Sequence, residues 1–147
     1  MIAKKRLRVN LKRKHAMQVT RVSVGKKKLV YVIVAQKKLK YPWGRSRIAY
    51  IGTTKKGMAR FAQSAAAKAE AVLGLYGIRE MEVRIITCDA RQSVKTWVKL
   101  ERALLLAFRE RYGRVPICNT VGGKIKRTDE DVYFAQKPIG KILDALA

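Results

Sequence analysis

The sequence is short of two residues on which many enzymes depend: it has one histidine, His15, and two cysteines among 147 residues. Without a second histidine, histidine-dependent nucleases, serine and cysteine hydrolases and histidine-ligated metal sites all lack their central residue. Cys88 and Cys118 have neither a C-x-x-C spacing nor histidine neighbours, and we interpret both as ordinary buried thiols rather than zinc ligands or a disulfide. Any catalysis must therefore use tyrosine, carboxylate, lysine and arginine.

Acidic residues are also scarce, and the first carboxylate in the chain is Glu70. The formal net charge of +24 is far beyond what solubility needs and predicts a polyanionic partner, most simply nucleic acid. Residues 1–28 contain no acid and predict a basic N-terminal arm that contacts phosphates, although a solvated tail or a localisation signal has the same composition. The residues we expect to bind nucleic acid are Lys4, Lys5, Arg6, Arg8, Lys12, Arg13, Lys14, Lys37, Lys38, Lys55 and Lys56.

Long apolar runs are absent, and no stretch is long enough to span a bilayer. The N-terminus is basic and no apolar region follows it, so we expect no secretory signal and a cytoplasmic or otherwise intracellular location, with the nucleoid as one such place. An anionic membrane surface is the alternative partner, but the arm lacks large apolar anchors. The sequence favours nucleic acid over a membrane and leaves the oligomeric state open.

The hydrophobic content of 48% is enough for one globular domain. Leu29–Ala35 is an unbroken apolar run that predicts a strand covered on both faces. Arg47–Thr54 predicts its antiparallel partner across a lysine-rich loop over 36–46. Met81–Cys88 alternates in polarity and predicts a half-exposed edge strand, and the weaker alternation of 17–24 is compatible with one further edge strand.

Apolar periodicity predicts a first long helix over residues 57–75, ended by Gly77. Arg60, Ser64 and Lys68 lie off its apolar stripe at intervals of four residues, so packing does not explain Arg60. A solvated surface arginine is the alternative explanation, and it is common in so basic a chain. Together with the three strands, the helices predict an α+β fold in which a small antiparallel sheet is packed with helices.

The second long helix is predicted to begin at a capping box of Asp89 and Gln92 and to end at Tyr112. Its apolar stripe calls for an apolar residue at position 101, where the sequence has Glu101. A carboxylate on such a face loses several kcal/mol of hydration unless it is paired, protonated or bound to a metal. A salt bridge and a metal site are therefore both open for Glu101.

Residues 122–147 predict a C-terminal tail with a short helix that begins near Pro138 and packs on the domain or on a partner. The acids at 129–131 follow one another directly and point in different directions, so we do not expect a metal site there. Asn119, in a loop before two glycines, either forms a turn or holds a site together by side-chain hydrogen bonds.

Each of the two predicted hairpin strands carries a tyrosine, in Leu29-Val30-Tyr31 and in Tyr50-Ile51-Gly52, and Arg60, Glu101 and Asn119 follow in that order. This order resembles the GIY-YIG nuclease family, which is named for a tyrosine on each strand of a hairpin. The second half of that motif is intact here, and the first half keeps its tyrosine but has leucine in place of glycine. Many members also have a histidine four residues after the arginine, where this chain has serine. The resemblance covers roughly residues 29–121 and consists of Leu29-Val30-Tyr31, Tyr50-Ile51-Gly52, Arg60, Glu101 and Asn119.

The resemblance implies a metal-dependent endonuclease that hydrolyses DNA phosphodiester bonds with Mg²⁺ or Mn²⁺. Glu101 would hold the metal, and Arg60 would neutralise charge on the phosphate. Tyr31 would accept a proton from the attacking water, and Tyr50 would orient that water. The resemblance also makes Asn119 a catalytic-site residue and Gly52 a structural one.

A non-catalytic protein is the main alternative to an enzyme. A ribosome-associated or RNA-coating component would have the same excess of positive charge and would keep the fold only as a scaffold for nucleic acid.

Overall fold

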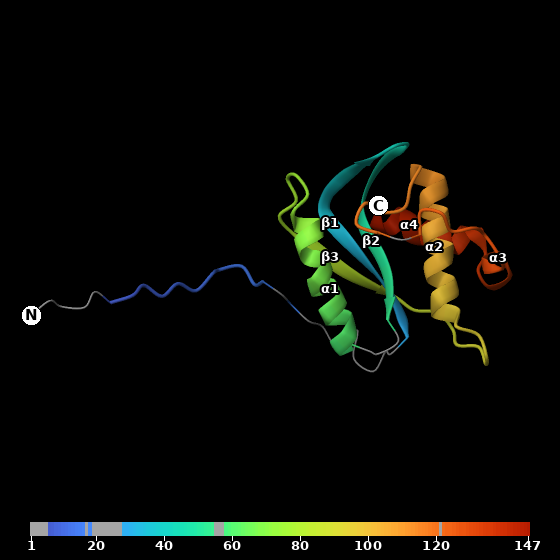
Figure 1. Cartoon of the computed structure of the whole chain (residues 1–147), viewed down its shortest axis with the longest axis horizontal. Helices are drawn as coiled ribbons and strands as arrows, with labels where there is room; N and C mark the ends of the chain where they lie inside the picture. Colours follow the sequence, from blue (N-terminus) through green and yellow to red (C-terminus); the bar gives the residue numbers. More distant parts are fainter. Residues whose placement is uncertain (1–5, 17, 19–27, 55–57, 121) are drawn as a thin grey trace, which may run out of the picture.

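The computed structural model describes residues 6–16, 18, 28–54, 58–120 and 122–147. Over these residues the chain has an α+β fold, as predicted, with a three-stranded antiparallel sheet of order β2-β1-β3. In Figure 1, α1 lies on one side of this sheet and α2 on the other. The elements are β1 (Leu29–Tyr41), β2 (Gly44–Thr54), α1 (Met58–Leu73), β3 (Met81–Ile86), α2 (Thr96–Tyr112), α3 (Glu130–Tyr133) and α4 (Gln136–Leu146).

The first strand is the centre of the fold. All seven residues of Leu29–Ala35 are buried, which confirms the prediction of a strand covered on both faces. β1 pairs with β2 on one side and with β3 on the other, so β3 is an edge strand as expected. In the β1–β2 ladder Tyr31 lies opposite Gly52, and Ile33 lies opposite Tyr50. These four residues therefore share one face of the sheet.

The predicted loop over 36–46 is wrong, because β1 continues to Tyr41 and β2 begins at Gly44. Only Pro42 and Trp43 form the turn. Inward-facing Tyr41 is 4% exposed, and its hydroxyl donates to the Ile48 carbonyl over 2.6 Å. Lysine and arginine fill the outward positions of this segment, and few of its residues face inward. The segment therefore contains too few apolar residues to predict a strand, and its composition is that of a polar loop.

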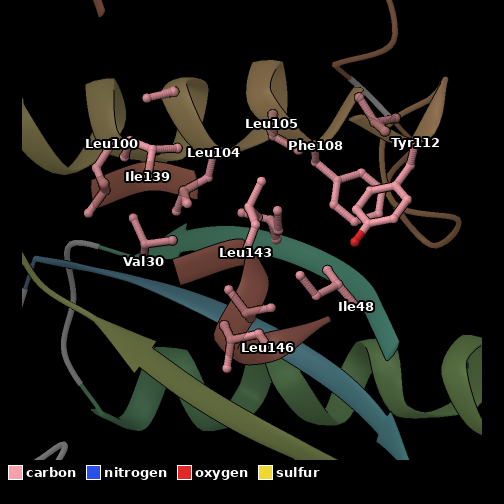
Figure 2. Close-up of a cluster of buried hydrophobic side chains, with 14 of the residues drawn as sticks. Val30, Ile48, Leu100, Leu104, Leu105, Phe108, Tyr112, Ile139, Leu143 and Leu146 are labelled. Carbon is pink, nitrogen blue, oxygen red and sulfur yellow. The ribbon is translucent and has the colours of Figure 1, made fainter. Parts of the chain in front are cut away.

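Two apolar cores lie on the two faces of the sheet. The core on the α1 side includes Tyr31, Ile33 and Val72, whereas the core on the other side is larger and is formed by β1, β2, α2 and α4. Figure 2 shows this larger core, with side chains of α2 and α4 gathered against the strands. Its labelled members are Val30, Ile48, Leu100, Leu104, Leu105, Phe108, Tyr112, Ile139, Leu143 and Leu146.

The C-terminal helix belongs to the domain core. α4 includes Pro138 near its start, as predicted, and its Ile139 and Leu143 side chains are 3% and 1% exposed. Both pack with α2 and the sheet. Of the two packing modes that the sequence leaves open, the structure therefore has the one within the chain.

Both long helices are shorter than the sequence predicts. α1 ends at Leu73 rather than near residue 75, and the Gly74 N–H bonds to the Glu70 carbonyl over 2.8 Å. The predicted capping box before α2 is wrong, because residues 91–94 form a turn in which Ser93 has φ 61°. A left-handed residue cannot continue a helix, so α2 begins at Thr96. Gly113, with φ 88°, ends α2 as predicted.

Several expectations concern residues around this core. Residues 6–16 are exposed and form no helix or strand, and Lys14 pairs with Glu80 over 2.9 Å. The proposed strand over 17–24 lies outside the described residues apart from position 18.

Both cysteines are free thiols, Cys118 buried and Cys88 half-buried. In the described part of the chain, no helix has the length and apolar character needed to cross a membrane.

Glu130 is the one acid of the 129–131 group that the fold buries completely, at 0% exposed. It pairs with Arg102 over 2.6 Å and accepts a hydrogen bond from the Thr128 N–H over 2.7 Å. Burial opposes ionisation, but these hydrogen bonds outweigh it and lower the pKa of Glu130 to about 2. This acid is therefore a structural ion-pair partner that ties α3 to α2.

We expect Glu130→Gln to lower the free energy of unfolding by about 3 kcal/mol at pH 7, since a carboxyl pKa lowered from 4.5 to about 2 stabilises the fold by that amount. A lowered pKa stabilises above pH 4.5, and the contribution disappears as the pH falls towards 2. Urea unfolding at pH 7 and pH 3 should show the gap between wild type and variant shrinking to about 1 kcal/mol. Asp144→Asn, which removes an exposed ion pair with Arg111, should cost less than about 1 kcal/mol; a gap independent of pH would contradict the assignment.

Candidate active site

The hairpin brings the two motif tyrosines together over a glycine. The ring centroids of Tyr31 and Tyr50 are 5.7 Å apart, because both side chains project from the same face of neighbouring strands. Gly52 lies beneath them: a Cβ atom added there would be 2.6 Å from Cε1 of Tyr50 and 2.9 Å from the hydroxyl of Tyr31. Only a residue without a side chain lets both rings reach this position.

The two phenols have different access to solvent. Tyr31 is 2% exposed, whereas Tyr50 is half-buried and carries the ammonium of Lys68 4.9 Å from its ring centroid. Burial raises the pKa of Tyr50, and the charge of Tyr31, its hydrogen bond to Tyr50 and the charge of Glu101 raise that pKa further. Tyr50 therefore stays protonated near neutral pH and is the phenol that meets water.

Glu101 lies on α2, in the layer on the other side of the sheet. The core position that the sequence assigned to it is taken by Leu100, which is 3% exposed, and Glu101 is half-buried beside it. Burial raises the pKa of Glu101, while a hydrogen bond with the Thr53 side chain and the charge of Arg102 act in the opposite direction. None of the ion pairs between described residues includes Glu101.

The carboxylate and the phenols lie on opposite faces of the sheet, at the same end of an edge strand. Thr53 lies opposite Val30 in the ladder, so it faces the α2 side, whereas Gly52 faces the α1 side with the tyrosines. β2 has no strand beyond it, and its outer edge separates the two groups. The charge of Glu101 adds to the rise in the pKa of Tyr50 across this edge, after the larger effects of burial and of Tyr31.

The side chain of Asn119 hydrogen bonds to the same edge of β2 as a neighbouring strand would. Its Oδ1 accepts from the Ile51 N–H over 3.0 Å, and its Nδ2 donates to the Ile51 carbonyl over 2.9 Å. One residue earlier, the Cys118 N–H bonds to the Ala49 carbonyl over 2.9 Å. A short loop thus satisfies the free edge of β2, and Asn119 fixes the segment that carries Tyr50 and Gly52.

We expect Asn119→Ala to lower the free energy of unfolding by about 1–3 kcal/mol, because it leaves the partly buried N–H and carbonyl of Ile51 without a partner. Hydrogen exchange should locate the loss, with the Ile51 amide exchanging faster and the amides of α4 unchanged. Asn119→Asp keeps the acceptor for the Ile51 N–H but places a carboxylate oxygen against the Ile51 carbonyl, so it should not restore wild-type stability. Equal Ile51 protection in Asn119→Ala and wild type would contradict the role.

Arg60 lies in the first turn of α1 and lines a pocket of about 390 Å³ at the end of the hairpin. The guanidinium is exposed and makes a hydrogen bond of 3.3 Å to Gln63. The pocket draws on three elements, because β2 ends where α1 and α2 both begin. Its lining residues are Thr53, Thr54, Arg60, Ser64, Lys95, Trp97 and Val98.

This pocket is positively charged. Arg60 and Lys95 line it, and the ammonium of Lys28 lies 4.7 Å from the ring centroid of Trp97. Glu101 is one helical turn beyond Trp97 on α2 and hydrogen bonds to Thr53 in the pocket wall. A phosphate group would therefore find cations on both sides and one carboxylate nearby.

The donors near Glu101 suit a hard divalent cation. The carboxylate of Glu101 and the hydroxyl of Thr53 offer oxygen atoms only, which Mg²⁺ and Mn²⁺ prefer, and Mg²⁺ keeps several waters of its own. Among the described residues, no group of three or more histidine, cysteine, aspartate or glutamate side chains is gathered in the manner of a metal site. The residues present thus fit a metal held by one carboxylate and substrate phosphate.

Sequence reasoning missed Thr53, Lys95 and Trp97, because the pocket forms only when two helices begin beside the same strand end. The position of Lys68 beside Tyr50 could have been predicted, since Lys68 lies on the same face of α1 as Arg60. Of the predicted nucleic-acid contacts, Lys37 and Lys38 are exposed, as are the predicted residues of 6–14. Lys4, Lys5, Lys55 and Lys56 lie outside the described residues.

At this end of the hairpin Arg60 lines the pocket and Glu101 lies beside Thr53 in its wall. Tyr31, Tyr50 and Asn119 do not line the pocket, and the two tilted phenols lie on the α1 side of the sheet. Comparison with protein-family models, with curated proteins and with solved structures finds no match to this chain.

Proposed function

We propose that the protein is a metal-dependent endonuclease that hydrolyses phosphodiester bonds in DNA. The observation that carries the proposal is the half-buried carboxylate of Glu101, which no described cation neutralises in an ion pair, beside a cationic pocket that includes Arg60. A buried acid of this kind costs stability, and a metal ion would recover that cost. The excess of positive charge supports a polyanionic substrate.

In this proposal the pocket binds the scissile phosphate. Arg60 reaches the phosphate oxygens with its planar set of donors and balances the charge that develops on them. Glu101 holds the metal, and a divalent ion in such a site supplies electrostatic stabilisation of the leaving oxygen. Lys95, across the pocket, helps to hold the neighbouring phosphate.

The phenol pair handles the water. Tyr50, the more exposed phenol, contacts the attacking water, while Tyr31 is buried behind it and hydrogen bonded to it. Tyr50 orients that water by hydrogen bonds, and Tyr31 holds the Tyr50 hydroxyl in place from behind. The raised pKa of Tyr50 keeps its hydroxyl protonated near neutral pH, so Tyr50 positions the water rather than accepting a proton from it.

A non-catalytic nucleic-acid-binding protein is the second candidate, and one observation favours it. Tyr31 is only 2% exposed, and the phenols lie on the opposite face of the sheet from α2, which carries Glu101. In that case the fold serves as a basic scaffold, and the two tyrosines are core residues with satisfied hydroxyls.

Incubation of the purified protein with supercoiled plasmid separates the two candidates. The endonuclease should convert supercoiled DNA to the nicked circle with Mg²⁺ or Mn²⁺ and stop in EDTA. The scaffold should retard the plasmid on a gel in either buffer, with strong salt dependence and no nicking. Retardation without nicking across a range of divalent ions and pH overturns the enzyme proposal.

A further inference from the structure

A second basic surface lies at the other end of the hairpin from the candidate active site. Pairing between β1 and β3 stops at Ala35, so the hairpin continues beyond the sheet as two strands, seen at the top of Figure 1. We call residues 37–47 the hairpin extension. Its exposed basic residues are Lys37, Lys38, Lys40, Arg45 and Arg47.

The central pair of this surface places like charges face to face. Lys40 lies directly opposite Arg45 in the ladder, an arrangement that destabilises a strand pair when no anion is present. No carboxylate precedes Glu70 in the sequence, and no ion pair between described residues includes either side chain. Repulsion between Lys40 and Arg45 therefore lowers the local stability of the hairpin extension, and a bound anion would remove that repulsion.

An aromatic ring is held beside these charges. Trp43, in the turn, is 70% exposed, yet its backbone N–H donates to the Tyr112 carbonyl over 3.2 Å. The indole lies against Gly113, where an added Cβ would be 3.0 Å from Cδ2. One part of the ring is thus covered and the rest faces solvent, as in a platform on which a base stacks.

We propose that the hairpin extension is a second nucleic-acid-binding surface, in which Lys40 and Arg45 grip the phosphodiester backbone and Trp43 stacks on an unpaired base. The inference rests on the proposed action on nucleic acid. Along β2, Arg45 and Thr53 of the pocket are separated by about 26 Å at about 3.3 Å per residue, roughly eight nucleotide steps of a duplex strand. The enzyme would thus hold its substrate at a point remote from the cut and favour DNA with a single-stranded part.

Binding of a labelled single-stranded 20-mer in EDTA, followed by anisotropy, tests the surface without any cleavage. Lys40→Gln/Arg45→Gln should weaken binding about tenfold and reduce the slope of log K against log salt by about 1.4, since each lost phosphate contact is worth about 0.7. Lys137→Gln/Lys141→Gln removes the same charge from exposed positions on α4 and should weaken binding less than about threefold.

A second measurement addresses the ring. Trp97→Phe leaves Trp43 as the only tryptophan, and its emission should be quenched by the 20-mer if a base stacks on it. Equal weakening by the two double variants, or an emission that does not respond to the 20-mer, overturns the proposal. Because EDTA prevents metal-dependent cleavage, a protein that passes both tests but never nicks plasmid refutes only the proposed endonuclease activity.

Discussion

Replacement of Glu101 by glutamine is expected to reduce Mg²⁺-dependent nicking of supercoiled plasmid by at least about 100-fold, because it removes the carboxylate that we propose holds the metal. The fold should survive. Burial raises the pKa of Glu101, so a neutral amide of the same shape is easier to bury than the carboxylate. Nicked and supercoiled DNA are resolved on agarose over time, at enzyme concentrations that give equal binding.

The matched control for this experiment is Glu70→Gln, the same substitution at an exposed position of α1. It should nick at the wild-type rate, and both variants should bind a 20-mer in EDTA as the wild type does. Thermal unfolding should show Glu101→Gln to be no less stable than wild type. If Glu101→Gln nicks within threefold of Glu70→Gln, the carboxylate does not hold a catalytic metal.

The central strand was predictable because both of its faces are covered, so every residue of Leu29–Ala35 is buried. A strand covered on both faces needs an unbroken apolar run, and Leu29–Ala35 has one. The hairpin extension is covered on one face only: its lysine and arginine side chains are exposed, and Leu39, Tyr41 and Ser46 face inward. Composition alone reads such a segment as a loop, since few of its residues are apolar.

The start of α2 was not predictable from capping chemistry alone. Asp89 and Gln92 have the spacing of a capping box, but the turn that closes with the Val94 N–H on the Arg91 carbonyl uses those residues differently. The local sequence is compatible with both structures, and the turn is the one that forms. Ser93 in the left-handed region gives no signal in the sequence.

The helical periodicity predicted that Glu101 faces the core. In the structure the neighbouring Leu100 takes that position and Glu101 is half-buried. α2 packs against both the sheet and α4, so its buried face is wide and includes Leu100 and the whole run 103–106. A single stripe of period 3.6 does not resolve the border of such a face. Glu101 lies at that border, beside Thr53, and is therefore half-buried rather than buried.

The second large effect is expected from Gly52→Ala, which should lower the free energy of unfolding by about 1–3 kcal/mol by overpacking and reduce nicking on the order of 100-fold. The new methyl group would lie 2.6 Å from the Tyr50 ring and 2.9 Å from the Tyr31 hydroxyl. Both rings are held between strand and helix, so at least one must leave its place. Urea unfolding and plasmid nicking measure the two consequences separately.

Gly123→Ala is the matched control for Gly52→Ala, because among the described residues, chain neighbours apart, no atom lies within 4 Å of the added Cβ at that position, and its stability should change by less than about 0.5 kcal/mol. The double variant Gly52→Ala/Tyr50→Leu then distinguishes crowding from a general defect of the strand. Removing the phenol hydroxyl and the rigid ring leaves room for the methyl group, so the double variant should regain part of the lost stability while nicking stays low. If the double variant is destabilised by the sum of the two single changes, the methyl group and the Tyr50 ring do not compete for the same space, and Gly52 is needed for some reason other than the contact between the two phenols.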